Sequence, residues 1–418
     1  MKIFRFPAAF LLLAGLGSPR LTMADINLHN FAGGNGDGAS PQGSPTLINS
    51  TLYGLTELGG SANNGTLFKI SSDGAGFSLV HTFLGGTSDG ALPLGSLTLN
   101  GSTFFGMTAI GGTGQGTVFK INTDGTGFNL LHSFSASSSD GRAPIGAVTV
   151  SGPMMFGLTQ QGGSAGNGTL FKMNTDGTGF SLLHSFGSTA NDGQLPRGAL
   201  TPSGNTLFGM TQHGGGFSSG TLFKINADGT GYSVLHDFTS LGADGHNPWG
   251  SLTFAGGSLF GMTASGGTGS GSGTIFKLNP DGTGFQVLHT FHGSRDGATG
   301  DLNDGAEPEG SLLLSGNTLV GMTRQGGARG KGAVFEINTD GAGLTLLDSF
   351  GAAGDGVYPM ADVTLSLSGD KLFGMTPEGG ASGNGIIFSV VVPEPASGSL
   401  LLFAAAVLIS SFRKRHAF

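Results

Sequence analysis

Short apolar stretches alternate with glycine-rich loops along this 418-residue chain, and the alternation recurs at a nearly constant interval. An apolar pair followed by Gly-Leu/Met-Thr marks each recurrence, with its glycine at Gly54, Gly106, Gly157, Gly209, Gly261, Gly321 and Gly374. Successive glycines lie 52, 51, 52, 52, 60 and 53 residues apart. A fixed period of this length indicates a repeat architecture, in which each unit buries its apolar face against the next.

Each unit contains four apolar segments separated by turn residues. After the triplet come a Gly-Gly loop, Gly-Thr-Leu-Phe-Lys, an Asp-Gly pair, a segment ending in Leu-His-x-Phe, a second Asp-Gly pair and Pro-x-Gly-x-Leu. Residues 180–186 show the period of two that is expected for a strand, and no helical period occurs between the two chain ends. Seven units of four short strands predict an all-β fold, a seven-bladed β-propeller of four-stranded blades.

The phase of the repeats predicts how the ring closes. The last unit stops near Phe388 and lacks its Leu-His-x-Phe segment, but Leu28-His-Asn-Phe31 supplies one close to the start of the chain. All seven units are complete only if this N-terminal strand finishes the last blade, which leaves no unpaired blade edge. We therefore expect one propeller over residues 25–390.

The two ends of the chain read as targeting segments. Residues 1–24 have two basic residues, an apolar run and small residues before Ala24, which is the layout of a secretory signal peptide. In residues 391–418, Pro393, Glu394 and Pro395 precede an apolar run, expected as a short hydrophobic helix, and the basic cluster at 413–415. Such a helix is near the lower length limit for spanning a bilayer. A plain C-terminal membrane anchor is the alternative to a sorting signal.

Two resemblances follow from these motifs. The tail resembles the PEP-CTERM sorting signal of bacterial envelope proteins, which implies recognition by an exosortase-type enzyme and at least transient membrane anchoring. The repeat, with Gly-Leu/Met-Thr, Gly-Thr-Leu-Phe-Lys and the Asp-Gly pairs, resembles the GloVer repeat over residues 26–390. That family implies an exported protein of the cell surface or extracellular matrix, but no established activity.

Composition excludes several classes of chemistry. The chain has no Cys, so disulfides, thiolate metal sites and a Cys nucleophile are unavailable. Residues 21–412 hold 12 basic and all 26 acidic residues, a formal charge of −14. So acidic a body disfavours nucleic acid and other polyanions as partners. No phosphate-binding loop or nucleophile-elbow motif is present, and we expect no cofactor.

The repeated polar residues are interpreted as structural. The His of Leu-His-x-Phe occurs in six units and is replaced by Asp348 in the seventh, and we expect a structural hydrogen bond that Asp348 preserves. The Asp-Gly pairs are expected to form type I′ hairpin turns. An insertion holding Asp296, Asp301 and Asp304 loosely resembles a calcium loop, but its glycine and its twelfth residue do not fit, so a plain loop is favoured.

Positions that differ between units are the candidates for ligand binding. The two residues after each triplet should emerge on one face of the ring, and the single Trp occupies another variable position. A rigid scaffold carrying variable polar groups and one aromatic suits a neutral or weakly basic polar ligand such as a glycan. Unselected loop variation is the alternative. The candidate ligand-binding residues are Trp249, Gln160, Gln212, His213 and Arg324.

These observations leave three functional hypotheses. The first is a non-enzymatic, monomeric envelope or matrix protein that binds a glycan or an envelope protein. The second is an extracellular polysaccharide-degrading hydrolase or lyase, which is disfavoured because glycosidases need two carboxylates in one cleft and the unmatched Glu57, Glu309 and Glu378 lie in three units. The third is a purely structural spacer.

Overall fold

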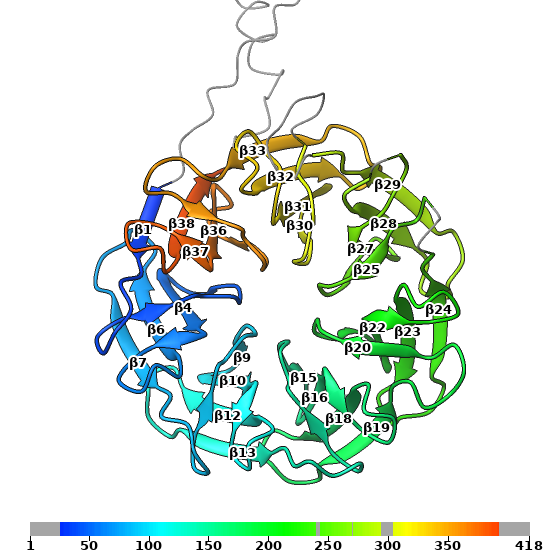
Figure 1. The fold of residues 1–418 in the computed structure, drawn as a ribbon, viewed down its shortest axis with the longest axis horizontal. Helices are drawn as coiled ribbons and strands as arrows, with labels where there is room; N and C mark the ends of the chain where they lie inside the picture. Colours follow the sequence, from blue (N-terminus) through cyan, green and yellow to red (C-terminus); the bar gives the residue numbers. More distant parts are fainter. Residues whose placement is uncertain (1–25, 240–242, 270, 294–303, 393–418) are drawn as a thin grey trace, which may run out of the picture.

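The computed structural model describes residues 26–239, 243–269, 271–293 and 304–392, and within these ranges every regular element is a β-strand. Seven sheets stand around a central axis like the blades of a propeller (Figure 1). The prediction of an all-β, seven-bladed propeller with four-stranded blades is therefore confirmed. The signal peptide and the C-terminal helix, with Pro393, Glu394 and Pro395, lie outside the described residues.

Each blade contains four antiparallel strands, arranged side by side from the axis to the outer rim and named below in that order. The strands of the first four blades are β3 (Thr46–Ile48), β4 (Thr51–Thr56), β6 (Thr66–Ser71) and β7 (Ser78–Thr82); β9 (Thr98–Asn100), β10 (Thr103–Thr108), β12 (Thr117–Asn122) and β13 (Asn129–Ser133); β15 (Thr149–Ser151), β16 (Met154–Thr159), β18 (Thr169–Asn174) and β19 (Ser181–Ser185); β21 (Thr201–Ser203), β22 (Thr206–Gly214), β23 (Thr221–Asn226) and β24 (Ser233–Asp237). The remaining blades consist of β26 (Thr253–Ala255), β27 (Ser258–Ser265), β28 (Thr274–Leu278) and β29 (Gln286–Thr290); β30 (Leu313–Ser315), β31 (Thr318–Thr323), β32 (Ala333–Asn338) and β33 (Thr345–Ser349); and β35 (Thr364–Leu365), β36 (Lys371–Thr376), β38 (Ile386–Val391) and β1 (Ile26–Asn30).

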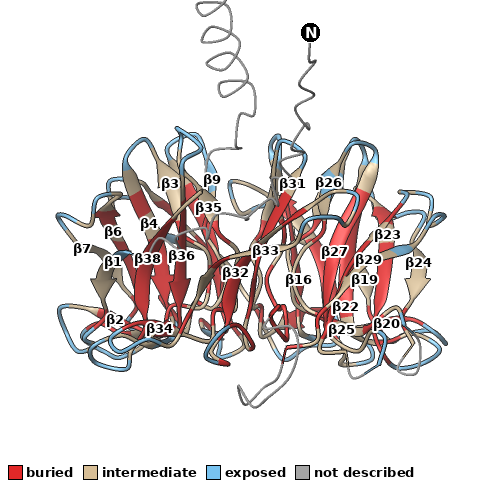
Figure 2. Cartoon of the chain, turned by 90° about the horizontal axis from the view of Figure 1, so that it is seen from above, coloured by how far each residue is buried: buried red, intermediate tan, exposed pale blue. Residues whose placement is uncertain are grey.

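One face of the ring carries an additional set of short strands, visible along the lower edge in Figure 2, and we call it the short-strand face. Four two-stranded pairs lie there: β2 (Gly38–Ala39) with β5 (Leu58–Gly59), β8 (Gly90–Ala91) with β11 (Ile110–Gly111), β14 (Gly141–Arg142) with β17 (Gln161–Gly162), and β34 (Gly356–Val357) with β37 (Glu378–Gly379). In the fourth and fifth blades, the extended ends of β22 and β27 pair instead with β20 (Gly193–Pro196) and β25 (His246–Pro248). These two sheets therefore contain five strands.

The ring closes through its first strand. β1 pairs with β38 in antiparallel register from Ile26 opposite Ser389 to Asn30 opposite Ile386, so the last blade is completed by the start of the body (Figure 1). Phe31, which follows β1, is fully buried between the last and first blades. The predicted closure is confirmed.

The core lies between blades, in seven clusters of aliphatic and aromatic side chains. The recurring triplet explains one detail of this packing. Gly106 on β10 lies opposite Phe119 on β12, and a Cβ at Gly106 would lie only 2.5 Å from the Phe119 ring. The glycine is required because the aromatic ring of the neighbouring strand folds over its backbone.

The repeated histidines form a rim of hydrogen-bonded pairs, as expected for a structural role. Each of the six contacts the Asp of the second Asp-Gly pair through Nε2, as in His132 with Asp140 at 3.1 Å and His184 with Asp192 at 2.9 Å. In five blades, the His ring also stacks on an aromatic ring of the next blade. The ring centres of His132 and Phe180, for example, lie 3.8 Å apart. Through this stacking, five of the six pairs contact the neighbouring blade.

The seventh position departs from the prediction. Asp348 does not preserve the hydrogen bond, because its buried Oδ2 has no hydrogen-bond partner among the described residues. Burial raises the pKa of Asp348 to about 6, and the nearby Asp355 carboxylate adds to this effect. Two acids therefore face each other where the other blades place a base and an acid.

The type I′ assignment of the Asp-Gly turns was also wrong. At Asp73-Gly74, only the glycine has a positive φ, of 89°. The Gly74 N–H donates to the Ser71 carbonyl at 2.8 Å, and the Ser71 N–H donates to the Ala75 carbonyl. These two hydrogen bonds define a type I turn followed by a glycine bulge. The Asp73 carboxylate accepts from the Ala75 N–H, so Asp is selected for its side chain and only Gly for its φ.

Candidate functional site

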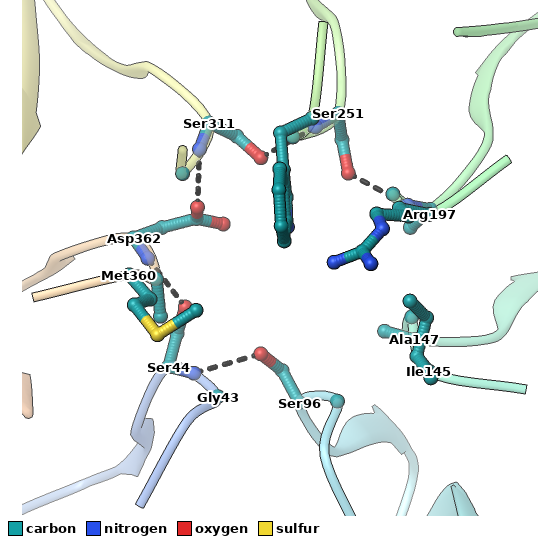
Figure 3. Close-up of a pocket in the computed structure, with 18 of the residues that line it drawn as sticks. Gly43, Ser44, Ser96, Ile145, Ala147, Arg197, Ser251, Ser311, Met360 and Asp362 are labelled. Carbon is teal, nitrogen blue, oxygen red and sulfur yellow. Dashed lines mark hydrogen bonds between the residues drawn. The ribbon is translucent and has the colours of Figure 1, made fainter. Parts of the chain in front are cut away.

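The Pro-x-Gly segments of six blades and the equivalent Pro359-Met-Ala361 segment of the seventh meet at the axis (Figure 3). The glycines lie backbone to backbone with the next blade, and a Cβ at Gly250 would overlap the carbonyl oxygen of Gly310. At Gly250, only a residue without a side chain fits. The segments therefore form a narrow collar whose geometry is fixed by the backbone.

Hydrogen bonds between neighbouring blades tie most of the collar together. Ser44, Ala199 and Ser251 each donate a backbone N–H, at 2.8 Å, to the hydroxyl of the equivalent serine in the next blade, namely Ser96, Ser251 and Ser311. Asp362 replaces serine in the seventh blade: it accepts from the Ser311 N–H, and its own N–H donates to Ser44 Oγ at 2.9 Å. Desolvation in the collar raises the pKa of Asp362. This acid therefore belongs to the collar.

A pocket of about 290 Å³ lies on the axis against this collar. The residue that directly follows Pro in each segment, which we call the slot residue, contributes to its wall in every blade. The seven slot residues are all different: Gln42, Leu94, Ile145, Arg197, Trp249, Glu309 and Met360. Leucine, isoleucine and methionine form an apolar part of the wall, whereas consecutive blades contribute Arg197, Trp249 and Glu309.

Arg197 is held in a fixed orientation in this pocket. Its guanidinium lies 3.7 Å from the centre of the Trp249 ring, in a cation–π contact. With the Gln160 amide oriented to match its neighbours, the amide oxygen accepts from Arg197 Nη2 at 2.9 Å and from Nε at 3.0 Å. Burial lowers the pKa of Arg197, and the charge of Glu309 opposes that shift. One face of the Trp249 ring is therefore covered by arginine.

Glu309 is the second notable polar group of the pocket. Its side chain is only 7% exposed, and among the described residues its Oε2 has no hydrogen-bond partner, although Arg324 Nε lies 3.9 Å away. Burial raises the pKa of Glu309 to about 7; the carboxylate of Glu307 adds to this rise, while Arg324 and Arg197 oppose it. Arg324 itself is paired with Glu307 at 3.3 Å. A buried hydrogen-bond acceptor without a partner destabilises the folded protein, and such groups are uncommon in native structures.

The structure brings some of the predicted ligand-binding residues together. Trp249 and Gln160 line the axial pocket, and Arg324 lies behind Glu309. Gln212 and His213 are half-buried on the extended end of β22 and are not among the lining residues. Arg197 and Glu309 were missed as site residues. Their position in the same variable slot as Trp249 was the available signal.

The acidic insertion yields no site within the described residues. Asp304 is the partner of His289, at 2.9 Å, and also accepts from the His292 N–H. Asp296 and Asp301 lie outside the described residues. Elsewhere in the described part of the chain, no three acidic or histidine side chains are grouped as metal ligands. The described ranges also contain no helix of the length and apolarity needed to cross a membrane.

Comparisons with known proteins agree on the architecture. The family model described as the Gloeobacter/Verrucomicrobia repeat matches residues 20–190 and 113–302. No curated protein matches the chain in sequence. Among solved structures, a Niastella koreensis GH74 enzyme is similar with a TM-score of 0.55 at 14% identity, over 88% of this chain and 53% of that one. An oligogalacturonate lyase in complex with manganese gives a TM-score of 0.52 at 10% identity, over 82% and 86%. At these identities the likeness shows the fold alone.

Proposed function

The chain belongs to the Gloeobacter/Verrucomicrobia repeat family, and on that premise we propose that it is a non-enzymatic binding module that holds a polar glycan in its axial pocket. The main support for this proposal is a contrast between two adjacent positions of each repeat. The collar glycine recurs in six of the seven units, whereas the adjacent slot residue differs in all seven. Variation directed into one pocket, on an otherwise repeated scaffold, is what a binding site requires.

The polar groups of the pocket suit a ligand rich in hydroxyl groups. Arg197 and Gln160 offer donors and acceptors in a fixed arrangement, and the Trp249 ring adds apolar surface. The opposite wall, with Leu94, Ile145 and Met360, can pack against the apolar face of a sugar ring. Preorganised groups of this kind lose little conformational entropy on binding.

Catalysis on a polysaccharide is the second candidate, and one observation favours it. A carboxyl group with a pKa of about 7, such as Glu309, has the property needed in a general acid. However, Asp362, the other acid among the described residues that line the pocket, accepts a hydrogen bond from the Ser311 N–H and is held in the collar. Glycoside hydrolysis needs a second carboxylate that is free to act as base or nucleophile, so we favour binding.

Affinity and product release can be measured together on the full-length protein with a panel of neutral and acidic polysaccharides. We expect retention without release of shorter fragments. Trp249→Ala should weaken retention by about 1–3 kcal/mol while leaving the melting temperature nearly unchanged. Phe217→Ala, which removes an exposed aromatic ring elsewhere on the short-strand face, is the matched control. Absence of retention on every polysaccharide would contradict binding, and fragment release abolished by Glu309→Gln would support the enzyme.

We also propose that the protein is exported and held at the cell surface by its C-terminal tail. In support, Val391 pairs with Lys371 at the start of β36, whereas Gln160 follows Thr159, at the opposite end of the equivalent strand β16. The described body therefore ends on the face opposite the one that supplies Gln160. A ring tethered through its tail would present the axial pocket away from the membrane. Mass spectrometry of the mature surface protein should find a chain end near residues 393–396, and recovery of intact residues 413–415 would contradict sorting.

A further inference from the structure

Arg197 differs from the other arginines that line or adjoin the pocket. Its guanidinium is stacked and hydrogen-bonded by Trp249 and Gln160, yet no carboxylate of the described residues lies within ion-pairing distance. Arg324, by contrast, is paired with Glu307. The labelled guanidinium of Arg197 points into the open centre of the collar in Figure 3. A partly desolvated positive charge is thus oriented toward the ligand space without a counter-ion.

Glu309 on the same wall supplies a complementary group. Its carboxyl is more than nine-tenths buried, and Oε2 has no hydrogen-bond partner in the described part of the chain. A protonated carboxyl in this position is a hydrogen-bond donor, whereas an ionised one would repel an anion. The pocket therefore combines an uncompensated arginine with an acid that can carry a proton.

From this arrangement we infer that the ligand of the axial pocket is an acidic glycan, with a uronate carboxylate bound by Arg197 and with Glu309 protonated in the complex. The inference rests on the proposed function and specifies its ligand class. A cationic ligand would be repelled by Arg197 and Arg324. A neutral ligand would leave the charge of Arg197 uncompensated, whereas a carboxylate matches the planar donors of a guanidinium.

The net charge of the body does not decide this question. A formal charge of −14 spread over residues 21–412 favours a neutral or weakly basic ligand. However, exposed charges are screened beyond about 8–10 Å at physiological salt, so the groups inside the pocket determine what binds there. The distant carboxylates of the rim slow the approach of an anion more than they weaken its final contacts.

Binding that requires a proton on Glu309 depends on pH in a defined direction. In the free protein its pKa of about 7 is set by burial and Glu307, against Arg324 and Arg197. Below pH 6 the proton is already present, while above pH 7 it must be taken up on binding. Affinity should therefore fall about tenfold between pH 6 and pH 8, since each pH unit above the pKa is worth one factor of ten.

The test compares one polymer in two forms. Full-length protein is passed over immobilised polygalacturonate and alginate, and over polygalacturonate whose carboxylates have been reduced to alcohols. We expect at least tenfold stronger retention on the acidic polymers. Equal retention on the reduced form overturns the inference but leaves the proposed function standing. No retention on either form, or on neutral polysaccharides, contradicts both.

Two variants separate site binding from general charge effects. Arg197→Gln should weaken retention on the acidic polymer at least tenfold, and the fold should tolerate it because Gln42 occupies the equivalent slot. Arg329→Gln makes the same change in net charge outside the pocket, at an arginine that donates to the Ser349 carbonyl, and should have no effect. Glu309→Gln should abolish the pH dependence while retaining binding at pH 8. Equal losses in the two arginine variants would overturn the inference.

Discussion

At the outer rim, six blades carry the same histidine–aspartate pair, whereas at the axis the seven equivalent slots hold seven different residue types. Both sets sit on the same repeated backbone and at fixed places in every unit. The rim pairs connect adjacent blades, so each copy has the same structural task and the same solution. The slots share one pocket, so their side chains can differ without disturbing the blades. In this ring, the repeated residues hold the fold together, whereas the variable residues line the axial pocket.

The most severe way to break the rim is to remove the strand that closes it. A chain beginning at residue 32 lacks β1, exposes the edge of β38 and loses the fully buried Phe31. Loss of a buried phenylalanine side chain alone costs about 3–5 kcal/mol. We expect aggregation or a fall of more than 10 °C in the melting temperature, on the order of what such a loss produces. A chain beginning at residue 26 is the control, and equal melting of the two would show that closure contributes little.

Adjacent residues at the axis should behave in opposite ways. Gly250→Ala places a methyl group against the carbonyl oxygen of Gly310, and because backbone cannot rotate away, we expect a loss of about 3 kcal/mol in unfolding free energy. Trp249→Ala, one residue earlier, should change stability far less and affect ligand retention instead. Denaturant unfolding of both variants measures the contrast. Similar losses from the two would mean that the slot is as structural as the collar.

A single rim pair should have a smaller effect. His132→Ala leaves the largely buried Asp140 without its Nε2 partner and removes the stacking on Phe180, so we expect a loss of about 1–2 kcal/mol. His213→Ala on the short-strand face provides a comparison, because His213 lies outside the rim. If both substitutions cost the same, the rim pairs have no special part in joining the blades.

The smallest expected effect is at Asp348, which stands where the other six blades have the rim histidine. The pKa of Asp348, raised in the folded protein to about 6, implies that ionising it costs stability progressively as pH rises from about 4 to 6. Asp348→Asn should therefore stabilise the protein at pH 7, by on the order of 1 kcal/mol, and should give no gain at pH 4. Denaturation at the two pH values tests the sign. A pH-independent effect would mean that Asp348 titrates normally.

The sequence was sufficient for the fold because the fold is periodic. The missing Leu-His-x-Phe segment after Phe388 and its presence at Leu28–Phe31 are enough to predict the closing strand. The site was predicted only in part. Trp249 was identified from its rarity, whereas Arg197 and Glu309 became recognisable only when the ring placed their slots side by side. Their burial, stacking and missing partners arise between blades, and no pattern within one unit encodes them.

The pairing of β1 with β38 also constrains when the molecule can be finished. Asn30 is synthesised 356 residues before its partner Ile386. At about 5–20 residues per second, the closing strand waits roughly 20–70 s for its neighbour to exist. Each blade can pack on the preceding blade as it is synthesised. Closure of the ring, however, requires β38, the last strand to be made. A truncated chain that lacks β38 remains an open arc with an unpaired blade edge at each end. Proteases can distinguish such exposed edges from a completed ring.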